Sequence, residues 1–382
     1  MGRKVAVVAV AQLVNEEVLH YNIREITYRV VKDLLEQCGM KRDEIETIVT
    51  SSSDHWQGIS CSNTFYYDAI GGYLKNSSKT EDDGAFAFLY GYLRVMSGHF
   101  DTAVVHAVTK SSEVPDPGTL TNLTADPFYQ RRLGLDDISA AALQAKLYMD
   151  RYGVTEEQAA RVVVRNLENA LDNPYAARRA KITVDDVLRS EVVAYPLKAL
   201  DCPQDSDATC AILLAAEEKV GKFTDTPVWV KGVGWSVDDF FLGDRDFLNG
   251  ALARAAKKAY AMAGIGRPRE EIDVAEICAP YSFQELLWCE QLGFCKEGEG
   301  GRLIEEGVTA RDGELPVNPS GGVLAANPYV ARGLIRIAEA ALQVMGKAGD
   351  RQVPGVKTAL AHSTHGLAGQ HHSVIILGRE GA

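Results

Sequence analysis

The sequence predicts an α/β fold in which helices cover a parallel or mixed sheet and the same plan occurs twice. Short apolar runs alternate with helical patterns along the first 110 residues, an order typical of strands joined by helices. The same order returns after residue 220, and a charged, helix-rich excursion at about 110–200 separates the two halves. We therefore expect a first half at 1–220, which includes the excursion, and a second half at 221–382.

The elements of the first half follow from apolar periodicity. Strands are predicted where short apolar runs occur, at 4–11, 46–50 and 102–108. A helix is predicted at 23–38, where apolar residues share one face. Another is predicted at 84–96, which is apolar and aromatic on all sides and therefore reads as a buried helix.

The excursion and the second half are assigned in the same way. Charged helices are predicted in the excursion at 140–152 and 155–169, and a strand at 209–216 ends the first half. The second half is expected to hold strands and helices in alternation, with two strands at its end. Its strands are predicted at 228–235, 273–277, 358–362 and 373–377, and its helices at 248–263, 283–292 and 331–345.

Composition excludes several classes of protein. The net charge of −12 argues against a nucleic-acid or anionic-membrane partner. No apolar run approaches the ~18 residues of a membrane span. The seven cysteines are odd in number, scattered and without a CxxC pair, so we expect reduced thiols in a cytoplasmic protein and no metal site.

The segment 316–333 is the part of the sequence that most clearly indicates an active site. Residues 316–333 read PVNPSGGVLAANPYVARG, and two further blocks accompany it, LGFCKEGEGGR at 292–302 and the polar stretch that begins at Cys202. Together they resemble the active-site loops of the thiolase superfamily, most of all its sterol-carrier-protein-type members. The resemblance implies the thiolase fold, two β/α halves in five layers (α-β-α-β-α), with the excursion forming the pocket for an acyl-CoA.

Against that family pattern the chain departs at its catalytic positions. Asn327 stands where the family has a histidine, and an amide cannot take up a proton near neutral pH. The family's nucleophilic cysteine would lie near position 81, which holds Glu81. Ionised by the helix N-terminus, Glu81 could act as a base, or it could simply cap the helix.

Other polar residues complete the predicted site. After the strand at 273–277 comes Cys278, a displaced nucleophile or a buried structural thiol, and Tyr281, a hydrogen-bond donor. Four histidines fall within 362–372, of which His365 is the leading acid/base candidate and His362 the next. We expect the remaining residues to hold substrate or coenzyme A: Asn318, Ser320, Gly321, Gly322, Tyr329, Gly366 and Gly369.

Three functions follow from the resemblance. The first is an acyltransferase that performs thiolytic (retro-Claisen) cleavage of a bulky, aromatic β-keto acyl-CoA, with the thiolate of coenzyme A attacking directly because the cysteine is missing. The second is a thiolase-like retro-aldolase acting on a β-hydroxy acyl-CoA through Tyr281 and Tyr329. The third is a non-catalytic subunit with the thiolase fold.

The resemblance also implies partners. Coenzyme A would be a co-substrate, with no permanently bound cofactor. Thiolases form homodimers through their first-half sheets, and relatives of this kind pair with a small OB-fold, zinc-ribbon protein. We therefore expect a heterotetramer built on a homodimeric core.

Overall fold

A nine-stranded mixed sheet forms the centre of the computed structural model, which describes residues 3–13 and 20–379. Its strands lie in the order β3-β2-β4-β7-β1-β8-β11-β10-β9, and β5 and β6 pair separately. The strands are β1 (Val5–Gln12), β2 (Thr47–Ser51), β3 (Asn76–Thr80), β4 (Thr102–Lys110), β5 (Val192–Ala194), β6 (Leu197–Lys198), β7 (Asp207–Ala216), β8 (Val228–Val237), β9 (Val274–Ile277), β10 (Thr358–His365) and β11 (His371–Gly378). The neighbours of β2 run parallel to it, as β9 does to β10, whereas β7, β8 and β11 pair antiparallel with their neighbours.

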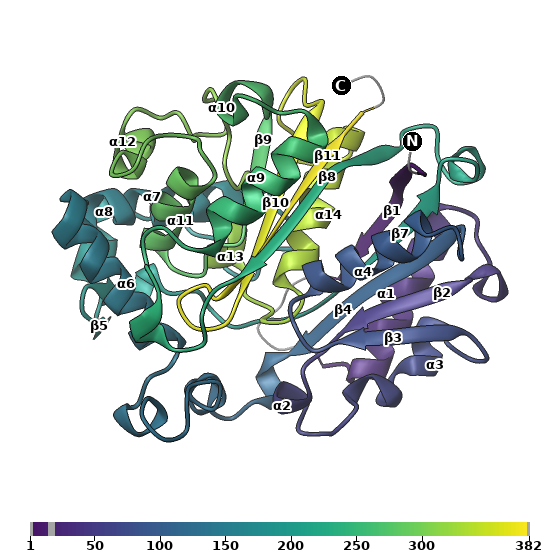
Figure 1. Cartoon of the computed structure of the whole chain (residues 1–382), viewed down its shortest axis with the longest axis horizontal. Coiled ribbons are helices and arrows are strands. Elements are labelled where there is room, and N and C mark those ends of the chain that lie inside the picture. The colour runs from purple at the N-terminus through teal and green to yellow at the C-terminus, as the bar shows by residue number, and fades with distance from the viewer. Residues whose placement is uncertain (1–2, 14–19, 380–382) are drawn as a thin grey trace.

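The sheet consists of two half-sheets joined by a short contact. β1 of the first half and β8 of the second pair over only two residues, Ala6 with Trp229 and Val7 with Val228. Figure 1 shows the two half-sheets on either side of this line. The mixed sheet with helices on its faces confirms the predicted fold class.

Helices form three layers around the half-sheets. The α-helices are α1 (Ile23–Gln37), α2 (Asp54–Gln57), α3 (Tyr67–Ile70), α4 (Gly84–Met96), α5 (Pro117–Asn122), α6 (Asp137–Tyr152), α7 (Glu156–Asn169), α8 (Val184–Arg189), α9 (Ala251–Ala263), α10 (Pro268–Glu271), α11 (Ser282–Gln291), α12 (Gly300–Glu305), α13 (Gly322–Ala325) and α14 (Arg332–Met345). α1 covers the outer face of the first half-sheet, and α9 and α11 cover that of the second. α4 and α14 lie between the half-sheets (Figure 1) and share one apolar core with both of them. Over the described residues, no helix has the length and hydropathy that crossing a bilayer requires.

The excursion packs against the second half of the chain. Ala145 of α6 and Val163 of α7 belong to the same buried cluster as Leu286 of α11. Asp136 and Thr155 cap these two helices by accepting hydrogen bonds from the N–H groups of Ser139 and Gln158. Because the excursion and the second half share a core, the division near residue 220 stays a prediction.

Two glycines let α9 lie directly on β8. A Cβ atom at Gly234 would stand 2.0 Å from the carbonyl oxygen of Ala255, and one at Gly232 would stand 2.2 Å from that of Ala259. Both contacts would be with helix backbone, which cannot rotate away as a side chain can. Glycine is therefore required here for the close approach of helix and strand.

We expect Gly234→Ala to lower the free energy of unfolding by about 1–3 kcal/mol, because the added methyl group overpacks this contact. Urea unfolding followed by circular dichroism measures the change. The matched control is Gly243→Ala, since a Cβ atom there meets nothing within 4 Å. Equal midpoints for the two variants would contradict the close contact of α9 with β8.

Candidate active site

The N-terminal ends of the two central helices meet at the carboxylate of Asp83. Its Oδ1 accepts hydrogen bonds from the N–H of Ala85 in α4 (2.9 Å) and from Oγ of Ser363 in β10 (2.5 Å). Its Oδ2 accepts from the N–H of Gly333 in α14 (3.0 Å). This one side chain therefore brings together three segments that are far apart in the sequence, around residues 82, 330 and 364.

Next to this junction, Asp82 faces two histidines. Its Oδ2 lies 2.5 Å from Nδ1 of His371, and its Oδ1 lies 3.8 Å from Nδ1 of His365. Burial by itself would raise the pKa of the Asp82 carboxyl, but His365 and His371 outweigh it and hold that pKa below its usual value. Burial lowers the pKa of His365, an effect that Asp82 opposes. A neutral imidazole beside an ionised carboxylate is suited to accept a proton.

The ring of Tyr329 lies in contact with both His365 and Arg332. The phenol ring stacks on Trp56 with centroids 4.4 Å apart, and the ring of His365 meets it edge-on at 5.5 Å. The guanidinium of Arg332 lies 4.7 Å from the same ring centroid and donates to Oδ1 of Asn327 (3.2 Å). Nδ2 of Asn327 in turn donates to Oδ1 of Asp205 (2.8 Å). Asp205, Asn327 and Arg332 thus form a continuous hydrogen-bonded chain.

A pocket of about 80 Å³ opens beside this chain. It is lined by Trp56, Pro117, Gly118, Thr121, Asp136, Asp137, Ile138, Cys202, Pro203, Asp205, Tyr281, Asn327 and Tyr329. Burial raises the pKa of the Asp205 carboxyl to about 6, and it also raises the pKa of Asp137 and of both tyrosines. The pocket therefore combines aromatic walls with groups that hold their protons more firmly than usual, and such clustered pKa shifts mark it as a candidate site.

The sequence candidates fall into different surroundings. Tyr281, Asn327 and Tyr329 line the pocket, and His365 lies against Tyr329. Glu81 is half-exposed; it pairs with Lys79 on β3 and accepts a hydrogen bond from the N–H of Asp54 (2.7 Å). The carboxylate near His365 belongs to Asp82, one residue further along the chain.

His362 and Cys278 are both buried away from solvent. Because successive strand residues point to opposite faces and Ser363 contacts Asp83, His362 faces the outer layer. There its Nε2 lies 3.0 Å from Nδ1 of His372, and Trp288 packs edge-on against both rings. Burial holds the pKa of His362 well below its usual value and raises that of the fully buried Cys278 thiol. Neither group is primed as an exposed base or nucleophile.

Most of the residues predicted to hold substrate or coenzyme A lie in two glycine-rich loops, and those of the first loop make hydrogen bonds within the protein. Asn318, at a left-handed φ of 51°, accepts from the N–H of Ile277 (2.7 Å) and donates to Glu285 (2.7 Å). Ser320 bonds to Glu276 of β9 through its hydroxyl and its N–H, and Gly321 and Gly322 complete this buried turn. Gly366 and Gly369 adopt positive φ in the connection between β10 and β11. Their roles in binding substrate stay predictions.

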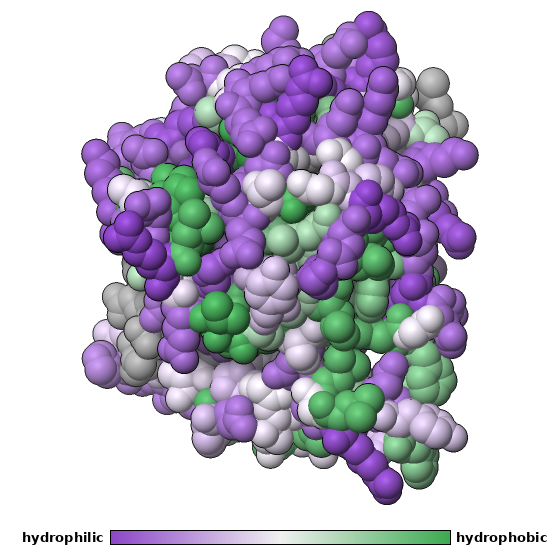
Figure 2. Space-filling model, turned by 90° about the vertical axis from the view of Figure 1, so that its left-hand side faces the viewer, coloured by the Kyte–Doolittle hydropathy of each residue, from purple (hydrophilic) through white to green (hydrophobic). Residues whose placement is uncertain are grey.

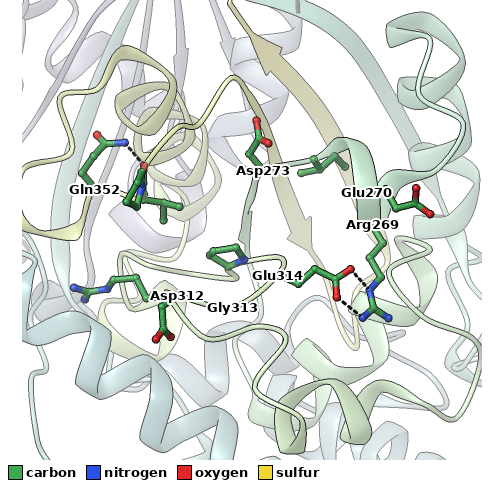
Figure 3. Close-up of a pocket in the computed structure, with 12 residues that line it drawn as sticks. Arg269, Glu270, Asp273, Asp312, Gly313, Glu314 and Gln352 are labelled. Atoms are coloured by element: carbon green, nitrogen blue, oxygen red, sulfur yellow. Dashed lines mark hydrogen bonds and ion pairs between the residues drawn. The ribbon is translucent and has the colours of Figure 1, made fainter.

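A larger cavity, of about 850 Å³, lies at the other end of β9. It is lined in part by Asp273, which precedes β9, whereas Cys278 follows that strand. Figure 3 shows its charged residues, of which Arg269 and Glu314 form a two-pronged ion pair. The smaller pocket is the better candidate, because Asp137, Asp205, Tyr281 and Tyr329 have shifted pKa values and line one space.

Four polar residues of this candidate site were not among the sequence candidates: Asp82, Asp205, Arg332 and His371. Asp82 directly follows the candidate Glu81, and His371 belongs to the group of four histidines within 362–372, so the sequence pointed to the neighbourhood of both. Arg332 lies inside the 316–333 segment. Asp205 gave a weaker signal, since its pairing with Asn327 spans more than a hundred residues of sequence.

Comparison with known proteins places these features in a family. Residues 238–379 match the family described as thiolase C-terminal domain-like. The acetyl-CoA acetyltransferase of Methanothermobacter thermautotrophicus is 37% identical over 289 residues, 75% of each chain. Sterol carrier protein 2 of Oryctolagus cuniculus is 35% identical over 59% of this chain and 42% of its own. The benzoylsuccinyl-CoA thiolase subunit BbsB of Thauera aromatica is 31% identical over 59% of both chains.

A solved structure shares the whole fold. The "Ltp2-ChsH2(DUF35) aldolase" superposes with a TM-score of 0.84 over 99% of this chain and 98% of that one, at 21% sequence identity. At this identity the likeness shows the fold alone.

We expect Asp82→Asn to lower the pKa of His365 further, because it removes the negative charge that stabilises the imidazolium. Nuclear magnetic resonance of the histidine Cε1–H groups, titrated against pH, measures this. His99 is an internal control, because it is exposed beyond the C-terminal end of α4 whereas Asp82 lies at the N-terminal end of that helix. An unchanged or raised pKa for His365 would mean that Asp82 does not act on it.

Proposed function

Because the chain belongs to the thiolase superfamily of acyltransferases, in its sterol-carrier-protein-like branch, we propose that it cleaves a bulky aromatic β-keto acyl-CoA with coenzyme A. The thiolate of coenzyme A attacks directly, without an acyl-cysteine. One observation carries this proposal: Asp82 and His365 stand at the N-terminal end of α4, the place where the family resemblance puts the nucleophilic cysteine. The aromatic Trp56–Tyr329 wall and the benzoylsuccinyl-CoA thiolase relative support an aromatic substrate.

In this mechanism His365 removes the thiol proton of coenzyme A and Asp82 stabilises the imidazolium that forms. The thiolate then adds to the β-carbonyl carbon, and the bond to the α-carbon breaks as the alkoxide collapses. The buried guanidinium of Arg332 provides a favourable field for the oxyanion. Coenzyme A serves as a co-substrate, and no permanently bound cofactor takes part. On the same premise we place the reaction in the cytoplasm.

Retro-aldol cleavage of a β-hydroxy acyl-CoA is the second candidate, and a specific observation favours it. Tyr281 and Tyr329 both line the pocket and Tyr329 lies against Asp137, so a phenol and a carboxyl stand where a β-hydroxyl would need a base. The aldolase whose fold matches is compatible with this chemistry. The aldol reaction needs no free coenzyme A, which separates the two candidates.

We expect the purified protein, alone or with its small partner, to cleave 3-oxo-3-phenylpropanoyl-CoA only when free coenzyme A is present. His365→Gln should lower kcat/KM by about 10²–10⁴-fold through loss of the base. His99→Gln is the matched control, since His99 is exposed beyond the C-terminal end of α4. Product mass, followed by liquid chromatography and mass spectrometry, measures both the reaction and any acyl adduct on the protein.

Each contrary result points to a different mechanism. Cleavage of 3-hydroxy-3-phenylpropanoyl-CoA without coenzyme A would establish the aldolase. An acyl adduct on Cys278 would replace direct attack by covalent catalysis, and a loss of activity in Glu81→Gln as large as that in His365→Gln would make Glu81 the base. No turnover under any condition would favour a non-catalytic subunit.

Two apolar surfaces support the proposed heterotetramer. β3 is an edge strand of the sheet, and Tyr90, Leu93 and Met96 are exposed on the adjacent α4, as suits a homodimer contact. A second surface covers the excursion, where Leu133, Leu143, Tyr195 and their neighbours form an apolar groove. Figure 2 shows apolar side chains gathered on this face. We assign this groove to the small OB-fold subunit, in line with the two-component name of the matching aldolase.

We expect Leu93→Glu to dissociate the homodimer and leave capture of the small subunit intact, while Leu143→Glu should do the reverse. Each substitution places a charge on one of the two apolar surfaces, so each variant is the control for the other. Native mass spectrometry of the co-expressed complex gives the stoichiometry directly. If both variants keep the wild-type stoichiometry, neither surface is the contact proposed for it.

A further inference from the structure

In the proposed thiolysis, none of the residues assigned so far supplies the proton that the departing α-carbon needs. When the carbon–carbon bond breaks, its electron pair stays on the α-carbon of the departing acyl-CoA, which must then receive a proton. Asn327 occupies the family's histidine position but has no proton to exchange near neutral pH. His365 takes the proton of the attacking thiol, so a second group is required.

We propose that Asp205 is the catalytic acid that protonates this carbon. Its carboxylate lines the pocket together with Asn327 and Tyr329. Oδ1 is held by Nδ2 of Asn327 at 2.8 Å, and among the described residues no hydrogen-bond donor contacts Oδ2. One oxygen is therefore fixed by the scaffold and the other is left for the substrate.

The backbone fixes the position of this carboxyl. The segment around Asp205 forms a parallel bridge with Asn327: the N–H of Asn327 donates to Gln204 (3.3 Å) and the N–H of Ser206 donates to Asn327 (3.2 Å). Two main-chain hydrogen bonds and one side-chain hydrogen bond thus join Asp205 to the start of the α14 segment. Such positioning is what a proton donor needs.

The charges around Asp205 suit an acid. Burial raises its pKa to about 6, Asp137 of α6 adds to the rise, and Asn327 and Arg332 oppose it. The other titratable groups that line the pocket, Asp136, Cys202, Tyr281 and Tyr329, carry no positive charge. With a pKa of about 6, roughly a tenth of the carboxyl is protonated at pH 7, far more than in an ordinary aspartate.

The step balances, and it rests on the proposed thiolysis. The bond from the β-carbon to the α-carbon breaks, the electron pair forms an enolate, and the Asp205 proton adds to the α-carbon. Asp205 is left as a carboxylate and regains a proton from solvent, while the proton taken up by His365 is released. No oxidant or reductant is needed.

The test uses the reverse half of this step, which needs no thiolysis. In D₂O the wild-type protein, in complex with its small subunit, should exchange the α-protons of acetyl-CoA for deuterium, as followed by mass spectrometry. Asp205→Asn should slow the exchange at least 100-fold, and Asp205→Glu should restore part of it. The matched control is Asp116→Asn, which removes a carboxylate next to the pocket-lining Pro117 and keeps the helix cap.

The pH profile provides the readout that a structural role would not move. Exchange needs the carboxylate and should rise with pH through about 6, whereas thiolysis needs the acid and should fall through the same range. Both limbs should disappear in Asp205→Asn. If that variant does not fold, as judged by circular dichroism, the wild-type profile and Asp205→Glu decide the question.

The outcomes separate this inference from the proposed function. Exchange that depends on Asp205 without any thiolysis would keep Asp205 as the acid and reject direct thiolysis. Exchange at the wild-type rate in folded Asp205→Asn would overturn the role of Asp205, whether or not thiolysis occurs. Absence of exchange in the wild-type protein, or a profile without a limb near pH 6, would overturn it as well.

Discussion

The buried carboxylate of Asp83 is the interaction on which the rest of this molecule depends. It accepts hydrogen bonds from α4, from α14 and from β10 at one point, and such donors compensate the hydration that a fully buried carboxyl loses. Burial raises the pKa of Asp83, and the hydrogen bonds from Ser363 and Ala85 oppose that rise. The positive ends of two helices add to this compensation. Gly333 makes the arrangement sterically possible, since a Cβ atom there would stand 1.8 Å from Oδ1 of Asp83. Because Asp83 fixes the starts of α4 and α14 next to each other, Asp82 before α4 and Tyr329 before α14 are held in the same candidate site.

In the mechanism proposed above, acid and base chemistry fall to groups in two different environments. On one side of Tyr329, burial lowers the pKa of the partly buried His365, and Asp82 offsets only part of that fall. On the other side, the partly buried Asp205 lies among carboxyl and phenol groups and keeps its proton to a higher pH. Burial therefore favours the neutral form of each group, and the neutral form of an imidazole is a base whereas that of a carboxyl is an acid. The cysteine expected near position 81 and the histidine that Asn327 replaces are therefore not needed for such a division of roles.

Much of the fold could be predicted from the sequence, because apolar periodicity reports burial directly. The helix predicted at 84–96 is α4, residue for residue. β3 escaped prediction because its sequence, NSSKT, is polar and pairs only with β2 at the sheet edge. The site was less predictable, since it depends on contacts between distant segments. Because strand residues alternate between faces, His362 and His365 point to opposite sides of β10, although they stand in one histidine cluster of the sequence. Asp205 becomes a candidate only through its hydrogen bond to Asn327, which is distant in the sequence.

The central layer also has a consequence for how the chain is made. α4 is completed early in synthesis, but α14, with which it shares a core between the two half-sheets, ends only at Met345. At the usual ribosomal rates the ribosome needs about 10–50 s to travel that far. During this interval the newborn chain carries an apolar helix with one side uncovered. A chaperone that shields α4 until α14 arrives would therefore raise the yield of this protein more than one that acts after release from the ribosome.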